Sequence, residues 1–257
     1  MALPTFAKRS PPLLGKPRKP LATPGMKKSI LSILLPILLG GAFAHGAVYT
    51  VNVGQTIQTA INSASSGDEI IVNGAFFDEA LVINGKSLTI RRQNLVPEIK
   101  SLTFTNAGGT SRLEGLKVSS DLNATSSNLE IRNVDFGGDL NASDSSLKLE
   151  NCDVIGFVQV NRGDLGLFNS DVHQSVTVNQ GSLRMTKCTV DQDLSVNHPS
   201  NQANADNRAV VLQSTITEKL TCKAKRSWIC YNTIRHAVLE GTTEITGNHF
   251  DGRTLNG

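Results

Sequence analysis

Apolar residues recur with a fixed period in the middle of the chain. Residues 121–192 hold four copies of an 18-residue unit, which begin at Asp121, Asp139, Phe157 and Ser175. A fixed period of this size is typical of a repeat protein, in which each unit buries its apolar face by stacking on its neighbours. Five unit positions are apolar in every copy: Leu122/Leu140/Val158/Val176, Ala124/Ala142/Val160/Val178, Leu129/Leu147/Leu165/Leu183, Ile131/Leu149/Leu167/Met185 and Phe136/Val154/Val172/Val190.

The spacing inside one unit predicts short strands. Its apolar positions come in pairs two residues apart, and the residues between the pairs are turn formers. The inward pairs begin at unit positions two and nine, which are seven residues apart. A left-handed coil built from hexapeptides would space its inward residues evenly, six apart. Together with the right-handedness of parallel crossovers, this predicts an all-β, right-handed parallel β-helix of roughly eight to ten coils.

Charged positions support one register of the coils. In the register set by the repeat, Glu130 lies beside Lys148 and Arg132 lies beside Glu150 on neighbouring strands. Opposite charges side by side are mildly stabilising, and a slip of one residue would lose both pairs. We interpret these residues as solvated pairs on a sheet face.

The sequence before the repeat predicts a cap for the N-terminal end of the β-helix. Residues 48–53 have the pattern of a first strand, and residues 69–73 that of a second. Between them, Ile57, Ala60, Ile61 and Ala64 recur at helical spacing. A short amphipathic helix at this place would cover the open apolar end of the solenoid.

The same segment resembles the opening of a known superfamily. Its motifs are Thr56-Ile57-Gln58-Thr59-Ala60-Ile61, Gly67-Asp68, Phe76 or Phe77 close to Glu79, and Lys86-Ser87-Leu88-Thr89-Ile90. This run of about forty residues is similar to the start of the pectin-esterase and pectate-lyase-like parallel β-helix superfamily. The resemblance implies the fold. It leaves the activity open, because binding proteins, adhesins and enzymes share this opening.

Composition and the N-terminal sequence predict an exported protein. Residues 1–25 are basic and Pro-rich, which indicates a disordered extension, and Met26 is a plausible alternative start. Residues 26–44 have the charged start, apolar core and A-x-A end of a signal peptide, so that residues 45–257 form the β-helix domain. An uncleaved membrane anchor is the alternative, although the apolar run is short for a span. We expect a periplasmic, cell-surface or secreted location and no membrane span after cleavage.

The sharpest candidate for chemistry is a column of acids. Asp135, Asp153 and Asp171 occupy unit position fifteen in three consecutive coils, facing outward. Carboxylates stacked in this way repel one another unless they are hydrated or share a cation, and Ca²⁺ takes oxygen ligands. Resemblance to pectate lyases, which bind calcium through carboxylates on neighbouring coils, also implies calcium. The alternative is a hydrated acidic stripe.

A second outward column is uncharged and suits hydrogen bonding to a glycan. Its residues occupy unit position three: Asn123, Asn141, Gln159, Thr177 and Ser195. Asn161, Asn179 and Asn197 form a similar column nearby. Such columns also occur on stacked coils for structural reasons. Of the four cysteines, Cys152 and Cys188 are expected to line the core, while pairing of Cys222 with Cys230 is open.

Three classes of function follow. A net charge of +3 with 5% aromatic residues excludes a strongly basic nucleic-acid binder. With little loop length to wall a groove apart from residues 198–208, the sequence favours a non-catalytic module that binds polysaccharide or another envelope component. A calcium-dependent polysaccharide lyase is the enzymatic alternative. A structural protein that self-associates through its coil ends is the third, since no amphipathic helix closes the C-terminal sequence.

Overall fold

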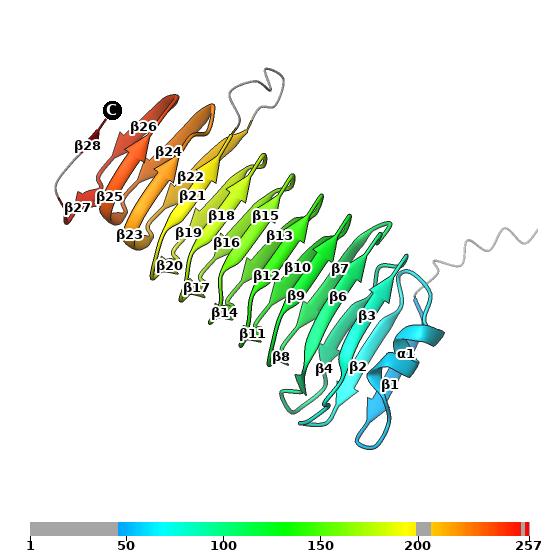
Figure 1. Cartoon of the computed structure of the whole chain (residues 1–257). Coiled ribbons are helices and arrows are strands. Elements are labelled where there is room, and N and C mark those ends of the chain that lie inside the picture. Colours follow the sequence, from blue (N-terminus) through cyan, green and yellow to red (C-terminus); the bar gives the residue numbers. More distant parts are fainter. Residues whose placement is uncertain (1–45, 199–206, 253–254, 257) are drawn as a thin grey trace, which may run out of the picture. The chain divides into compact units, whose positions relative to one another are not determined.

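The computed structural model describes residues 46–198, 207–252 and 255–256, and these residues form a parallel β-solenoid of about eleven turns (Figure 1). The predicted all-β parallel β-helix with a short N-terminal helix is confirmed. The expected eight to ten coils were too few, because less regular coils on both sides of the repeat also complete turns. The predicted extension, the signal peptide and most of the 198–208 loop lie outside the described residues.

Each coil gives one strand to an eleven-stranded parallel sheet, here called sheet A. Its strands, in spatial order, are β1 (Val48–Asn52), β2 (Glu69–Asn73), β4 (Thr89–Arg92), β7 (Thr110–Glu114), β10 (Asn128–Arg132), β13 (Ser146–Glu150), β16 (Leu165–Phe168), β19 (Leu183–Thr186), β22 (Arg208–Leu212), β24 (Arg226–Cys230) and β26 (Thr242–Thr246).

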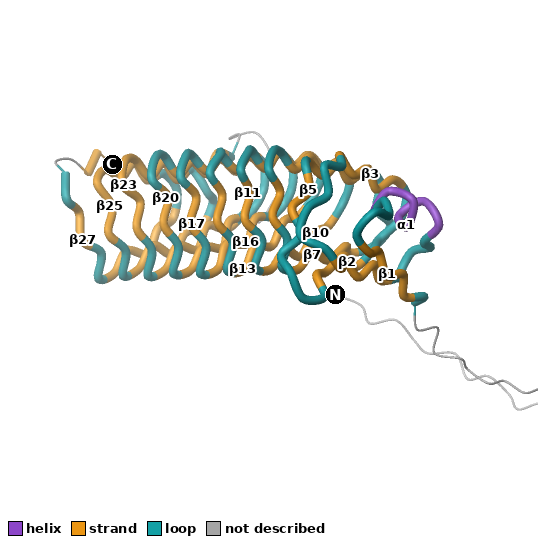
Figure 2. The backbone as a smooth tube through the Cα atoms, turned by 90° about the horizontal axis from the view of Figure 1, so that it is seen from below, coloured by secondary structure: helices purple, strands orange, loops and turns teal. Residues whose placement is uncertain are grey.

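The other 17 strands form sheet B, which consists of two rows. The row of longer strands is β3 (Ala80–Asn84), β6 (Ser101–Thr105), β9 (Leu122–Thr125), β12 (Leu140–Ser143), β15 (Val158–Asn161), β18 (Val176–Asn179) and β21 (Leu194–Asn197). The row of short strands is β5 (Glu98–Ile99), β8 (Lys117–Val118), β11 (Asp135–Phe136), β14 (Asp153–Val154), β17 (Asp171–Val172) and β20 (Thr189–Val190). The C-terminal coils add β23 (Thr215–Cys222), β25 (Thr233–Leu239), β27 (His249–Phe250) and β28 (Leu255–Asn256). Figure 2 shows the coils stacked one on the next.

The interior is built as the repeat predicts. All twenty residues of the five apolar columns are buried, each with an exposed fraction of 2% or less. Neighbouring coils pair like with like, for example Leu129 with Leu147 and Leu147 with Leu165. The apolar side chains therefore stack into continuous inward columns, which bury each coil against the next.

The predicted register is confirmed, but only one of its two ion pairs forms as expected. Arg132 Nε lies 3.3 Å from Glu150 Oε2. Glu130 stands beside Lys148 in the register, yet its carboxylate pairs with Arg112 on the preceding coil, at 3.0 Å. Because a strand in a stacked sheet has two neighbouring strands, a charged side chain can form its ion pair with a residue on either of them. Arg112 lies one coil before the four-copy repeat, where the sequence pattern did not reach.

The corners of each coil depend on single left-handed residues. Unit position thirteen has a positive φ in four consecutive coils, at Asn133, Asn151, Asn169 and Lys187. Asparagine tolerates this conformation better than other non-glycine residues do, because its short side chain can bond locally. The turn residues of the repeat thus define where the chain bends.

At unit position fourteen, backbone N–H groups donate hydrogen bonds to buried serine side chains on the next coil. The Cys152 N–H donates to Ser170 Oγ at 3.0 Å, and the Cys188 N–H donates to Ser214 Oγ at 3.2 Å. Cys152 and Cys188 are buried, as expected, and burial raises the pKa of the Cys152 thiol to about 11. Cys222 and Cys230 are free as well, and they lie in different sheets. None of the four thiols is therefore engaged in a disulfide.

Helix α1 (Ile57–Ser63) lies against the first coils and packs on β1, β2 and β3 (Figures 1 and 2). Ile57 and Ile61 are buried against the core. The predicted cap is confirmed. In the described ranges, no helix has the length and apolar character needed to cross a bilayer.

Candidate functional site

The predicted polar column lies on the row of longer strands in sheet B. Asn123 stands beside Asn141, which stands beside Gln159, and the series continues in register through Thr177 to Ser195. At ~4.8 Å between strands, these five positions span about 19 Å along the solenoid. The structure therefore brings all five residues together in one line.

A second uncharged line runs parallel to the first, two residues further along each strand. Its members are Thr125, Ser143, Asn161, Asn179 and Asn197. The amides are fixed by one another, since Asn179 Nδ2 donates to Asn161 Oδ1 at 2.8 Å and Asn197 Nδ2 donates to Asn179 Oδ1 at 3.0 Å. We call these two lines of five the polar face. All ten of its outward positions are uncharged.

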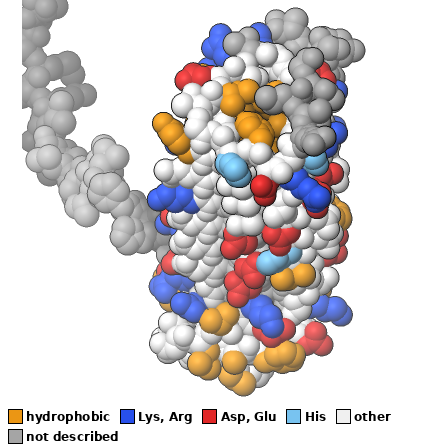
Figure 3. Space-filling view, turned by 90° about the vertical axis from the view of Figure 1, so that its left-hand side faces the viewer, with side chains coloured by type: hydrophobic (Ala, Val, Ile, Leu, Met, Phe, Trp, Pro, Cys, Tyr) orange, Lys and Arg blue, Asp and Glu red, His pale blue; other side chains and the backbone are white. Residues whose placement is uncertain are grey.

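The predicted acidic column is also in register. Asp135 stands beside Asp153, and Asp153 beside Asp171, on the short strands β11, β14 and β17. Figure 3 shows acidic side chains gathered beside a histidine on this side of the solenoid. Among the described residues, no three His, Cys, Asp or Glu side chains are grouped closely enough to hold a metal ion. Calcium binding by this column stays a prediction.

A histidine missed by the sequence analysis links this column across coils. His173 Nε2 lies 2.9 Å from Asp153 Oδ1, and His173 Nδ1 lies 2.8 Å from Asp191 Oδ2. Carboxylates accept hydrogen bonds, and both ring nitrogens can donate only when His173 is protonated, so this arrangement favours the charged form of the ring. The bond to Asp191 and the charge of Asp153 raise the pKa of His173. A calcium ion on the column would compete with this histidine for Asp153.

The residues that carry the superfamily resemblance are used by the cap. Glu79 accepts hydrogen bonds from the N–H groups of Ile57 and Gln58, at 2.8 and 3.0 Å, at the start of α1. Lys86 Nζ donates to the carbonyls of Ile61 and Ala64 at the end of the same helix, at 3.0 and 2.6 Å. Both charges therefore satisfy helix ends that have no partner within the helix.

Two further motif residues act in the same way. Asp68 is buried and accepts from the N–H groups of Ala47 and Ser65, each at 2.7 Å. Gln58 donates to the Val82 carbonyl at 3.0 Å and accepts from the Val82 N–H at 2.8 Å, which covers the edge of β3. The motif is thus explained by the fold, and it supplies no free acid or base.

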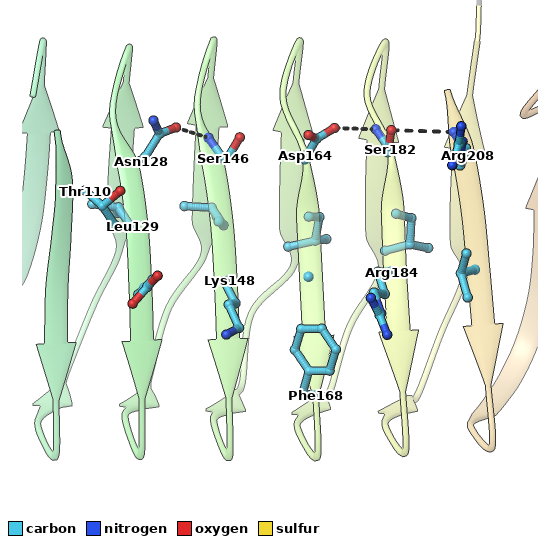
Figure 4. Close-up of a pocket in the computed structure, with 16 residues that line it drawn as sticks. Thr110, Asn128, Leu129, Ser146, Lys148, Asp164, Phe168, Ser182, Arg184 and Arg208 are labelled. Atoms are coloured by element: carbon cyan, nitrogen blue, oxygen red, sulfur yellow. Dashed lines mark hydrogen bonds between the residues drawn. The ribbon is translucent and has the colours of Figure 1, made fainter. Parts of the chain in front are cut away.

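Sheet A carries a shallow hollow that the sequence analysis did not predict. It has a volume of about 650 Å³ and extends over five neighbouring coils, from Asn128 on β10 to Val210 on β22, with Thr110 of β7 at one edge (Figure 4). On the middle one of these coils the Phe168 ring lies over Gly166, between Lys148 and Arg184. We call this the cationic hollow. Its sequence signal is a break in two outward columns, where glycine and phenylalanine replace charged residues.

No protein-family model and no curated protein sequence matches the chain. Among solved structures, it is similar to the PL6 family alginate lyase AlyGC, at 13% sequence identity and a TM-score of 0.39. The match covers 81% of this chain and 40% of the lyase, so the chain spans less than half the length of that enzyme. At this identity and TM-score, the similarity transfers no activity to the chain.

Proposed function

We propose that this chain is an exported, non-catalytic β-helix module that binds polysaccharide along its polar face. The observation that supports the proposal most is the polar face itself. Ten outward positions on five consecutive coils are uncharged hydrogen-bonding side chains, held in register by the backbone.

A regular uncharged face suits an extended, neutral glycan. Hydroxyl and amide groups both donate and accept, as sugar hydroxyls do. The side chains Asn161, Asn179 and Asn197 are already ordered by their mutual hydrogen bonds, so less conformational entropy is lost when a ligand binds. Each contact contributes about 0.5–1.5 kcal/mol at most, so useful affinity requires several coils at once. Binding should therefore rise with glycan length.

Retention on immobilised polysaccharides tests the proposal. The full chain is passed over neutral and acidic polysaccharides, with calcium and with chelator, while absorbance of unsaturated products is followed. The proposal expects retention on a neutral polysaccharide, independent of calcium and without product.

A double variant assigns this retention to the polar face. Gln159→Ala with Thr177→Ala removes two central side chains, and affinity should fall about tenfold, the effect of roughly 1.4 kcal/mol. The matched control is Glu114→Ala, an exposed residue of β7 on sheet A, which should bind as the wild type does. Equal loss in both variants would contradict the proposal.

The acidic column supports an enzymatic alternative, a calcium-dependent polysaccharide lyase. The observation behind this alternative is the in-register alignment of Asp135, Asp153 and Asp171. Calcium-dependent product in the same assay, lost in Asp153→Asn, would replace the binding proposal with the lyase. Concentration-dependent filaments with neither product nor retention would favour a structural protein that self-associates through its coil ends.

A further inference from the structure

Two cations that line the cationic hollow lie close to its aromatic ring. Lys148 Nζ and the Arg184 guanidinium each lie 5.8 Å from the centre of the Phe168 ring. Within the part of the chain that the structure describes, neither side chain forms an ion pair with a carboxylate. The aromatic ring orients the cations through its electron-rich face but leaves their net charge available to a ligand.

Gly166 makes this arrangement possible. A Cβ atom at this position would lie 2.9 Å from Cε2 of Phe168, closer than van der Waals contact allows. Without that atom, the ring can lie against the strand instead of standing away from it. The exposed side of the ring and the two cations thus form one surface.

The rest of the hollow is polar on one side. Thr110, Asn128, Ser146 and Ser182 line this edge, each on a different coil (Figure 4). Asp164 stands in the same line, where its carboxylate accepts a hydrogen bond from the Ser182 N–H at 3.0 Å. The lining also includes Glu130, which is paired with Arg112. The cations of the hollow therefore lie next to a row of hydroxyl and amide groups that also contains the Asp164 carboxylate.

The geometry points to a second binding site, on sheet A, for a linear acidic glycan lying along the solenoid axis. The apolar face of one sugar ring would contact Phe168. Lys148 and Arg184, two coils and roughly 10 Å apart along the stack, would bind carboxylate or sulfate groups on either side. Hydroxyl groups would meet Ser146 and Ser182.

The same features disfavour a nucleic acid. Single strands are bound by several stacked aromatic side chains along a basic groove. Of the residues that line the hollow, only Phe168 is aromatic, and its charged members are three cations and two acids. The polar row, by contrast, matches the hydroxyl groups that a glycan presents at each sugar.

Titration calorimetry with a linear oligogalacturonate tests the site in the full chain. Lys148→Gln and Arg184→Gln should each weaken binding about tenfold, because each removes a charge-assisted hydrogen bond. Arg184→Lys, which keeps the positive charge, should bind with most of the wild-type affinity. A carboxyl-reduced oligosaccharide of the same length should bind far more weakly. Added salt should lower the affinity for the acidic oligosaccharide, because it screens the charges.

Arg235→Gln is the matched control. It removes the same charge from an exposed arginine of β25 on sheet B, where Arg235 is paired with Glu218 and neither residue lines the hollow. Its effect should be less than about twofold. Equal loss in the Arg235 and Arg184 variants would show a general charge effect and overturn the site. Tighter binding of oligothymidylate than of oligogalacturonate would also overturn it, in favour of nucleic acid.

This site goes beyond the proposed function, and the two can fail separately. Gln159→Ala/Thr177→Ala should leave oligogalacturonate binding unchanged, and Arg184→Gln should leave retention on neutral polysaccharide unchanged. Loss of oligogalacturonate binding in the polar-face double variant, with none in Arg184→Gln, would place the acidic ligand on sheet B and contradict the inference.

Discussion

The regular coils of residues 121–192 and the N-terminal end of the solenoid use their polar residues in different ways. At the N-terminal end, Glu79, Lys86 and Asp68 bond to backbone groups around α1. In the regular coils, the backbone groups are satisfied by neighbouring coils, so outward side chains such as Gln159 and Thr177 are left for other contacts. A family-like motif therefore marks structure here, and the less distinctive repeat carries the candidate sites.

The largest effect should come from breaking an inward column. Leu147→Asp places an unpaired charge in the core and should lower the free energy of unfolding by several kcal/mol, or prevent folding. The neighbouring outward variant Ser146→Asp should change it by about 0.5 kcal/mol or less. Denaturant unfolding compares the two, and similar losses would contradict the assignment of inward and outward positions.

The next effect concerns the cap. Glu79→Ala leaves the N–H groups of Ile57 and Gln58 without their acceptor and should cost about 1–3 kcal/mol. Asp78→Ala, at the exposed neighbouring residue, is the control. Both are measured by denaturant unfolding. If Glu79→Ala instead removed an activity while leaving stability unchanged, Glu79 would have to be reassigned from the cap to an active site.

A smaller effect is expected at the corner of one coil. Lys187 has a φ of 54°, at the unit position where three preceding coils have asparagine. Lys187→Asn should raise the free energy of unfolding by about 0.5–1 kcal/mol, since asparagine tolerates this conformation at lower cost. The reciprocal variant Asn169→Lys should lower it by a similar amount. Thermal unfolding measures both, and a change of the same sign in the two variants would contradict the explanation.

The smallest effect should follow from His173 and depends on pH. Its pKa is raised above its ordinary value of 6.5 by Asp191 and Asp153, so its contribution to stability is fully present below that value. It is lost as pH rises through the folded-state pKa. Because the partners are exposed, the contribution should be under about 1 kcal/mol.

Midpoints of thermal unfolding for the wild type and His173→Gln should therefore differ at pH 5 and converge at alkaline pH. If the two midpoints instead converged as the pH was lowered, His173 would not be held as a cation between the two acids.

The sequence predicted the parts of the structure that repeat with the coil. The column Leu129/Leu147/Leu165/Leu183 and the alignment of Asp135 with Asp153 both follow from the 18-residue period, because stacking places equal unit positions side by side. The cap could be predicted from the helical spacing of Ile57 and Ile61.

Which neighbour a side chain contacts could not be predicted in this way. His173 shares unit position seventeen with Asp191, as the period requires, but its contact with Asp153 at position fifteen depends on the side-chain direction. The choice of Arg112 by Glu130 depends on a coil outside the repeat. The cationic hollow depends on how the Phe168 ring lies over Gly166, since a column pattern gives a residue's place but not its rotamer.

The most direct measurement of the central claim is a lysine scan across the first line of the polar face. Single variants at Asn123, Asn141, Gln159, Thr177 and Ser195 are compared for retention on the neutral polysaccharide, with Thr186→Lys on sheet A as control. Polysaccharide binding along the polar face predicts the greatest loss at Gln159, smaller losses towards Asn123 and Ser195, and none in the control. Equal retention in all six variants would contradict it.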